Sequence, residues 1–295
     1  MSLKRTYQQG FTLIELMVSL TIGLLVSLAA VNLFITNQST FNLQKGLGDV
    51  GDNGRFALEF MAQGMRQAGY VPTQVVANND WPQVITAATD FPSGVAGVIS
   101  QNNQAALPVY TGTGNQGGVG ASDSLMIQYY TPVEARDCEG DIVPANNYIL
   151  ARFYLRADSA AATGSALACE GGYHTGALDS ALTNFETGNT KGVILLSAVD
   201  NFQVLVGVAD TTSGSLNRPQ QYITVAAYAA LAAPKPPVAA IKLGLLVSSV
   251  EKAGNKIPQT QSFNVLNEVI TAASVPSDTR VRRVFTSTVS FRNVL

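Results

Sequence analysis

The chain has 295 residues, enough for one large domain or two small ones. Charged residues make up 13%, about half the roughly 25% usual in soluble domains, and the net charge is -2. This composition excludes collagen, a disordered chain, a disulfide-dense miniprotein and a polytopic membrane protein, and it offers no positive excess for nucleic acid. One His and two Cys leave almost no material for a zinc site or a Cys/His catalytic pair, so we expect no enzyme, no metal and no cofactor.

One long apolar segment lies near the N-terminus, from Phe11 to Ile35, and its single charge is Glu15. A helix of this length would measure about 37 Å, which exceeds the roughly 30 Å of a bilayer's hydrocarbon core. The preceding residues carry Lys4 and Arg5 and no acid. Positive flanks stay in the cytoplasm, so we expect the C-terminal bulk of the chain on the other side of a membrane.

Two simpler readings of this segment fail. A secretory signal peptide has a shorter apolar region followed by small residues, whereas here Ser27–Ala30 falls inside the apolar run. A plain membrane anchor explains the length but not Glu15, because an ionisable group in a spanning segment costs free energy unless a partner charge offsets it.

The segment Gly10–Glu15, with the sequence GFTLIE, resembles the processing motif of type IV prepilins. The resemblance implies that a prepilin peptidase cleaves after Gly10 and that the new N-terminal Phe11 is N-methylated. It also implies that Glu15 pairs with the N-terminal amine of a neighbouring subunit during assembly. Residues 1–10 would then be a leader, and residues 11–35 a transmembrane and assembly helix.

Simple electrostatics agrees with that resemblance. Cleavage would remove Lys4 and Arg5 and leave the amine of Phe11 as the nearest positive charge to Glu15. The two groups lie about 6 Å apart along one helix, and other copies present the same amine. A carboxylate in a low-dielectric medium is costly alone and much less so when paired. We therefore expect Glu15 to set the register between neighbouring subunits.

Residues 36–70 continue as an amphipathic helix that ends before Pro72. Gly46, Gly48, Gly51 and Gly54 each cost about 1 kcal/mol against Ala, so a continuous helix and a break into two helices are both open. The apolar stripe, with spacings of three or four residues, consists of Leu43, Leu47, Val50, Gly54, Ala57, Met61, Met65 and Ala68.

Two further segments resemble the minor pilins called PilW. Asp52–Leu58 together with Arg66–Tyr70 is similar to that family's NGRFAL and R-x-AG-[FY] signature, and Arg282–Asn293 is similar to its ending. The resemblance implies a structural protein that helps initiate pilus assembly and sits at or near the fibre tip.

The same resemblance implies partners and a location. The partners would be other minor pilins, the major pilin, the prepilin peptidase, the inner-membrane assembly platform and a tip adhesin. The chain would cross the inner membrane once, with its head in the periplasm, and later join the pilus fibre at the cell surface. A J-type minor pseudopilin of type II secretion shares the GFTLIE start and a β-rich head, and a membrane-tethered periplasmic enzyme is a third reading.

Residues 71–295 form the expected head. Together with the helix they predict an α+β fold, in which a long N-terminal α-helix packs on an antiparallel β-rich, pilin-like head. We expect residues 71–122 to be loops with one short strand at Val95–Ser100, and Ala232–Pro237 to be a stiff connector. The strand candidates are Leu125–Thr131, Tyr148–Arg156, Val193–Ser197, Phe202–Val208, Tyr222–Tyr228, Ile241–Val250, Phe263–Ile270 and Val281–Arg292.

Cys138 and Cys169 are the only cysteines. An even count outside the membrane favours a disulfide over two free thiols, worth roughly 3–4 kcal/mol for a loop of this length. His174 lies in a Gly-rich segment and is expected to be a solvated loop residue. The acids between Asp137 and Asp141 lack the spacing of a known calcium loop, which leaves calcium as a minor alternative.

Overall fold

A computed structural model of the chain describes the long helix and the sheets of the head. The expected loops and short strand within 71–121 lie outside the described residues except for 84–85, and the expected connector at 232–237 does so except for Pro236. The described residues are 10–70, 84–85, 122–158, 164–175, 182–185, 192–209, 218–224, 227–228, 230–231, 236, 238–252, 261–271 and 278–291.

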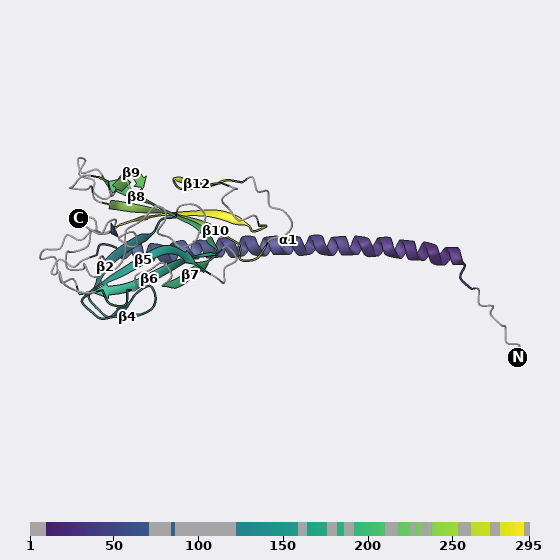
Figure 1. Ribbon diagram of the computed structural model, residues 1–295, viewed down its shortest axis with the longest axis horizontal. Helices are drawn as coiled ribbons and strands as arrows, with labels where there is room; N and C mark the ends of the chain where they lie inside the picture. The colour runs from purple at the N-terminus through teal and green to yellow at the C-terminus, as the bar shows by residue number, and fades with distance from the viewer. Residues whose placement is uncertain are drawn as a thin grey trace.

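A single helix, α1 (Leu13–Gln67), dominates the molecule with 55 residues. Its first half projects from the head and its second half runs through it (Figure 1). The helix continues without a break through Gly46–Gly54, which decides between the two alternatives that the sequence left open. Gly46, Val50 and Gly54 are buried against the head, and this packing outweighs the low helix propensity of glycine.

The first sheet of the head has the strand order β1-β2-β5-β6-β7, and all neighbouring strands are antiparallel. Its longest pairing joins β5 and β6, where Arg152 lies opposite Glu170. The strands are β1 (Val84–Ile85), β2 (Leu125–Thr131), β5 (Asn147–Ala157), β6 (Ser165–His174) and β7 (Val193–Ser197).

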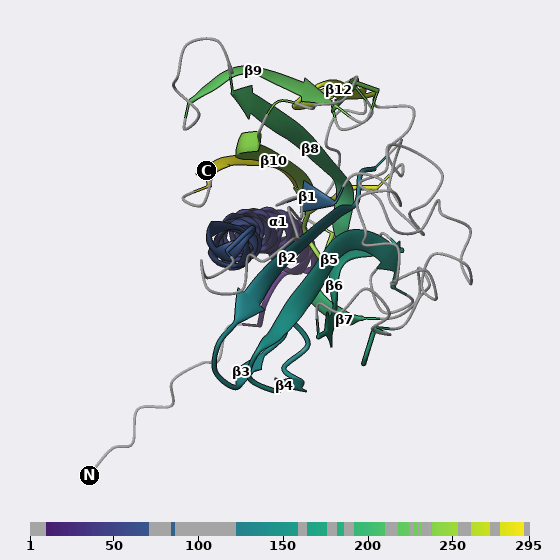
Figure 2. The same cartoon turned by 90° about the vertical axis from the view of Figure 1, so that its left-hand side faces the viewer.

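The second sheet has the order β13-β10-β8-β9 and is also antiparallel. Figure 2 looks along α1 and shows the helix in the opening between this sheet and the first one. Two small hairpins complete the head, β3 with β4 and β11 with β12. The bounds are β3 (Ala135–Arg136), β4 (Ile142–Val143), β8 (Val199–Ala209), β9 (Pro219–Thr224), β10 (Val238–Ser248), β11 (Phe263–Val265), β12 (Glu268–Ile270) and β13 (Arg282–Ser290).

One hydrophobic core joins the helix to both sheets, as the alternation of strand residues and the helical stripe require. The α+β prediction of a long apolar helix packed on antiparallel sheets is therefore confirmed. Buried members of the core include Met61 and Met65 from α1, Leu125, Ile127 and Phe153 from the first sheet, and Phe202, Val204, Ile241 and Leu243 from the second.

Most strand candidates appear with small shifts at their ends, and three corrections follow. Phe263–Ile270 is a hairpin and not one strand, because Leu266 adopts a positive φ of 55° at its turn. The strand predicted to reach Tyr228 ends at Thr224. Strand β6 was missed, since its alanines and glycines have low β propensity and its two buried faces remove the polar alternation.

Candidate functional site

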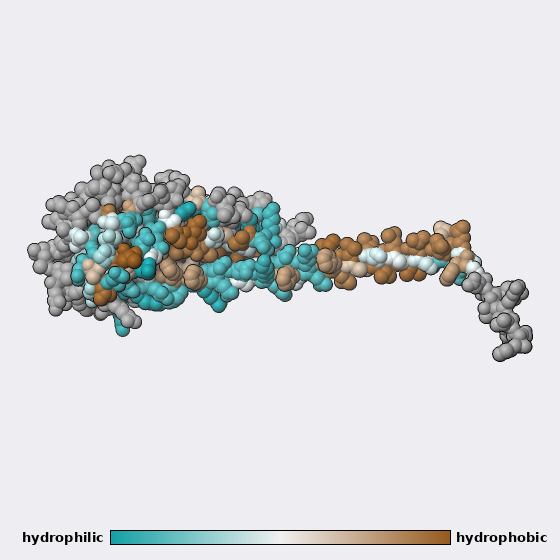
Figure 3. Space-filling view, turned by 90° about the horizontal axis from the view of Figure 1, so that it is seen from below, coloured by the Kyte–Doolittle hydropathy of each residue, from teal (hydrophilic) through white to brown (hydrophobic). Residues whose placement is uncertain are grey.

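The projecting half of α1 presents a continuous apolar surface. Every residue from 10 to 38 is exposed, including Phe11 at 90% and Leu13 at 78%. In Figure 3 this half is mostly brown, and the part that follows it is largely teal. By length and composition α1 is long and apolar enough to cross a membrane. A surface of this size needs lipid or other apolar helices around it, because soluble proteins rarely expose apolar patches beyond a few hundred Å².

The predicted processing residues lie at the start of this helix. Gly10 and Phe11 are exposed and precede the first helical residue, so the peptide bond that joins them is outside the helix. Space around Gly10 is open, with no atom within 4 Å of where a Cβ would stand. This geometry leaves the bond accessible to a protease, although cleavage and methylation at these residues stay predictions.

Glu15 has a partner in its own chain that the sequence analysis overlooked. Its Oε2 accepts hydrogen bonds from the backbone N–H of Thr12 at 3.0 Å and from the Thr12 hydroxyl at 2.9 Å. The backbone N–H of Glu15 in turn donates to Thr12 Oγ1 at 3.3 Å. This reciprocal pair is a capping box, and the T-x-x-E spacing that signals it is visible in the sequence. One carboxylate oxygen thus caps the helix in the single chain.

The two PilW-like segments meet where α1 crosses β13. A Cβ on Gly54 would lie 2.5 Å from Cδ2 of Phe285, so only glycine allows the aromatic ring to sit directly on the helix backbone. Ala57 and Leu58, from the same segment, are buried in the core. The packing between helix and core therefore explains the residue types at Gly54, Ala57, Leu58 and Phe285.

Charged residues of the C-terminal segment hold β13 in place. The Arg282 guanidinium contacts Asp200 of β8 at 2.8 Å and Asp278 at 2.8 Å. Burial raises the pKa of Asp200, whereas hydrogen bonds from Arg282 and Arg280 outweigh burial and lower the pKa of Asp278. These ion pairs fix the strand that packs against α1.

Phe56 is not buried by this packing. It stands within the NGRFAL-like segment, yet it is 59% exposed, and its ring centroid lies 6.3 Å from that of Phe60. Arg55 beside it is exposed as well. Neither of these two side chains is buried by the described part of the chain.

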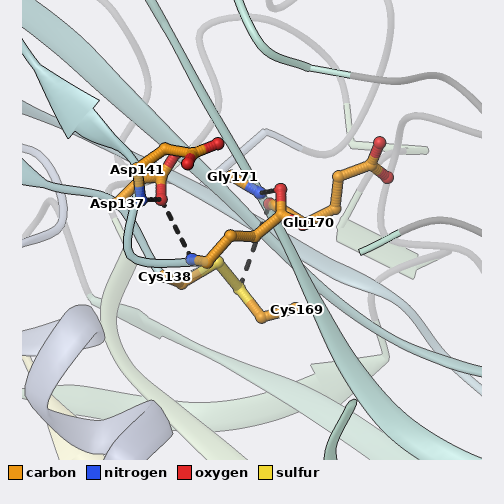
Figure 4. Close-up of a disulfide and its surroundings, with 7 residues drawn as sticks. Asp137, Cys138, Asp141, Cys169, Glu170 and Gly171 are labelled. Carbon is orange, nitrogen blue, oxygen red and sulfur yellow. Dashed lines mark hydrogen bonds between the residues drawn. A yellow bond between two sulfur atoms is a disulfide. The ribbon is translucent and has the colours of Figure 1, made fainter. Parts of the chain in front are cut away.

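The predicted disulfide between Cys138 and Cys169 is present, with Cα atoms 6.2 Å apart. It joins the β3–β4 hairpin to the middle of β6, and Figure 4 shows the hydrogen bonds around it. Asp137 Oδ1 accepts from the backbone N–H of Asp141 at 2.9 Å, and Glu139 Oε2 accepts from the backbone N–H of Gly171 at 2.8 Å.

The acids of this hairpin therefore build its turn and attach it to β6. Among the described residues, no group of three or more His, Cys, Asp or Glu side chains is placed to hold a metal ion.

His174 is not the solvated loop residue that the sequence suggested. It ends β6, is 1% exposed, and its ring stacks on that of Tyr148 with centroids 5.2 Å apart. Burial lowers the pKa of His174 to about 4, so the imidazole is neutral in the folded protein at neutral pH. The prediction failed because the strand that carries His174 was not recognised.

Comparisons with known proteins bear on this arrangement. The model of the prokaryotic N-terminal methylation motif matches residues 5–31, and that of type IV pilus-assembly protein W, PilW, matches residues 152–293. No curated protein matches the chain. A solved structure with some similarity is the type IV-like pilin TTHA1219 from Thermus thermophilus, with 16% identity over 63% of this chain and 84% of that chain, at a TM-score of 0.29.

The two family matches cover the start of α1 and much of the head. The methylation-motif match contains Gly10, Phe11 and Glu15. The PilW match contains strand β6, which carries Cys169, and the whole of β13. Residues 152–293 of the chain thus match the PilW family of type IV pilus-assembly proteins, and its N-terminal region carries the N-terminal methylation motif of prepilins.

Proposed function

We propose that this protein is a minor pilin with a structural and not an enzymatic role. Residues 1–10 act as the leader, residues 11–35 cross the inner membrane and later enter the fibre, residues 36–70 extend the helix, and residues 71–295 form the periplasmic head. The observation that carries the proposal is the wholly exposed apolar half of α1 within the methylation-motif match. The apolar surface of such a helix is shielded from water by lipid before assembly and by other pilin helices afterwards.

Cleavage after Gly10 and methylation of Phe11 convert the chain into its assembly form. The exposed bond ahead of the helix supports this step, since the prepilin peptidase needs access to an unwound backbone. Intact mass of the protein extracted from the inner membrane tests it. We expect a mass lower by residues 1–10 and higher by one methyl group. A chain that still begins at Met1, with its head in the cytosol, contradicts the proposal.

Glu15 then guides the chain into register with a neighbour. Its Oε2 serves the cap on Thr12, and the bonds described leave Oε1 for the terminal amine of another subunit. A carboxylate in apolar surroundings gains most from a cation at one position, so a misplaced neighbour would leave it unpaired. The cap and the charge are separate properties of this residue.

Three variants separate these two properties. Glu15→Gln keeps a side-chain acceptor for the cap but removes the charge, whereas Thr12→Ala weakens the cap and keeps the charge. We expect Glu15→Gln and Glu15→Ala to reduce incorporation into sheared pili, while Thr12→Ala is incorporated and all three are cleaved normally. Wild-type incorporation of Glu15→Gln would show that the charge does not set the register.

The chain acts at the start of assembly and sits near the fibre tip. Its partners there are other minor pilins, the major pilin, the inner-membrane assembly platform and a tip adhesin. The PilW match over residues 152–293 supports the pilus over the type II secretion alternative. A deletion strain tests both, because loss of surface pili and twitching with normal protein export supports the proposal. Lost export with normal pili would support a J-type pseudopilin.

A further inference from the structure

A pocket of about 530 Å³ opens where α1 ends, between β2 and the β3–β4 hairpin. Its volume lies within the range of small-molecule sites, about 300–1,000 Å³. Among the described residues its lining contains no Asp or Glu. The side chains that matter for its chemistry are Arg66, Gln67, Tyr70, Tyr129, Thr131 and Arg136.

The end of α1 is fixed to β2 by the backbone. The N–H of Gly69 donates to the carbonyl of Gln128 at 2.9 Å, and the N–H of Tyr130 donates to the carbonyl of Tyr70 at 2.8 Å. Tyr70 is therefore held beside the strand that supplies Tyr129. The helix end and the strand thus form one rigid wall of the pocket.

The opposite wall is held by the disulfide. Arg136 lies in β3 and donates from its guanidinium to the carbonyl of Gly140 in the same hairpin. The bond between Cys138 and Cys169 then ties this hairpin to β6. Because both walls are anchored, the backbone that carries the lining residues is in place before any ligand arrives, which lowers the entropic cost of binding.

The pocket concentrates positive charge on a chain whose net charge is -2. Arg66 contributes one guanidinium and Arg136 the other, from two different elements. Arg66 contacts Glu59 at 3.1 Å, but the two side chains are 48% and 60% exposed, and exposed ion pairs of this kind are weak. Each guanidinium has further N–H groups in a planar fork that fits a carboxylate.

The remaining lining suits a ring that carries hydroxyl groups. Tyr70 is 42% exposed, Tyr129 is partly exposed, and both residues line the pocket. Gln67 and Thr131 add polar groups beside them. Aromatic faces pack against the C–H face of a sugar, and the hydroxyls and amide bond its polar edge.

We propose that this pocket binds an acidic saccharide, with the carboxylate between Arg66 and Arg136 and the sugar ring against Tyr70 and Tyr129. The sugar ring accounts for the two tyrosines, and its carboxylate accounts for the two arginines, which have no Asp or Glu beside them among the described lining residues. The site lies where the end of α1 meets the head, and it is present whether or not the chain starts pilus assembly.

Full-length protein in detergent, titrated with monosaccharides by calorimetry or ligand-observed NMR, tests the proposal. The acidic probes are glucuronic acid and N-acetylneuraminic acid, and the neutral probes are glucose and N-acetylglucosamine. We expect the acidic probes to bind and the neutral ones to bind at least about tenfold more weakly, with affinity falling as salt rises.

Two variants and a control assign the effect to the pocket. Arg66→Gln and Arg136→Gln should each weaken acidic-sugar binding about tenfold without changing the melting temperature. Arg55→Gln, on an exposed position of the same helix outside the lining, should leave binding unchanged. Equal binding of neutral sugars, no binding of either acid, an equal effect of Arg55→Gln, or binding of acidic peptides in place of sugars would each overturn the proposal.

Discussion

The contact between Gly54 and Phe285 allows a quantitative test of how the helix is seated on the head. Gly54→Ala places a Cβ 2.5 Å from Cδ2 and Cε2 of the Phe285 ring and 2.8 Å from its Cγ. Overpacking of this kind costs about 1–3 kcal/mol, while alanine gains about 1 kcal/mol in helix propensity. We therefore expect a free energy of unfolding that is unchanged or reduced by up to about 2 kcal/mol.

Gly48→Ala and Gly51→Ala are matched controls in the same helix. A Cβ at either position has no atom within 4 Å, so each variant should gain about 1 kcal/mol. Thermal unfolding of the full chain in detergent measures all three, and 1 kcal/mol corresponds to about 2–4 °C in Tm for a domain of 150–250 residues. Gly54→Ala should melt below both controls.

A second substitution locates the clash. Phe285→Leu shortens the side chain opposite Gly54, so the double variant should lose less stability than the two single variants together. A Gly54→Ala variant that is stabilised as much as Gly48→Ala would refute the reasoning, since the ring would then have room to move aside.

Three further outcomes concern the head. Replacing Cys138 and Cys169 by Ser should lower the free energy of unfolding by about 3–4 kcal/mol, and wild type in reductant should melt like the variant. Burial lowers the pKa of His174 to about 4, below its usual 6.5. As the pH falls, His174 is therefore protonated in the unfolded chain at a higher pH than in the folded protein. Stability from this group should fall between pH 6.5 and 4 in urea unfolding, and His174→Phe should remove that slope. Burial raises the pKa of Asp123 to about 7, so its contribution should instead fall as the pH rises from about 4 to 7. Asp123→Asn, which keeps an acceptor for Val204 N–H, should abolish this fall.

The sequence was most informative where one local pattern decides the structure. The long apolar and amphipathic run predicted α1, and β-branched and aromatic runs predicted β2 and β7 with their observed bounds. It was least informative for β6, whose Gly171 and Gly172 have no local strand signal and extend because β5 pairs beside them. Missing that strand also misplaced His174.

Apart from the disulfide between Cys138 and Cys169, contacts between distant segments could not be predicted from the sequence. Arg152 and Glu170 form an ion pair at 3.7 Å with side chains 2% and 1% exposed, which requires the register of β5 on β6. The processing residues were predicted from their motif and stay a prediction, whereas the cap from Thr12 to Glu15 was overlooked although its spacing is local. The acidic-sugar pocket draws on the end of α1, on β2 and on β3, and no spacing in the sequence indicates that these meet.

The head buries residues of α1 only from Gly46 onward, while residues 10–38 are all exposed in the described structure. The backbone hydrogen bonds of the free half all lie within the helix itself. Transfer of this helix from lipid into a bundle of similar helices therefore replaces one apolar environment with another, and no backbone hydrogen bond has to break. In the proposed function, the subunit would therefore leave the bilayer with its helix intact and its folded head unchanged.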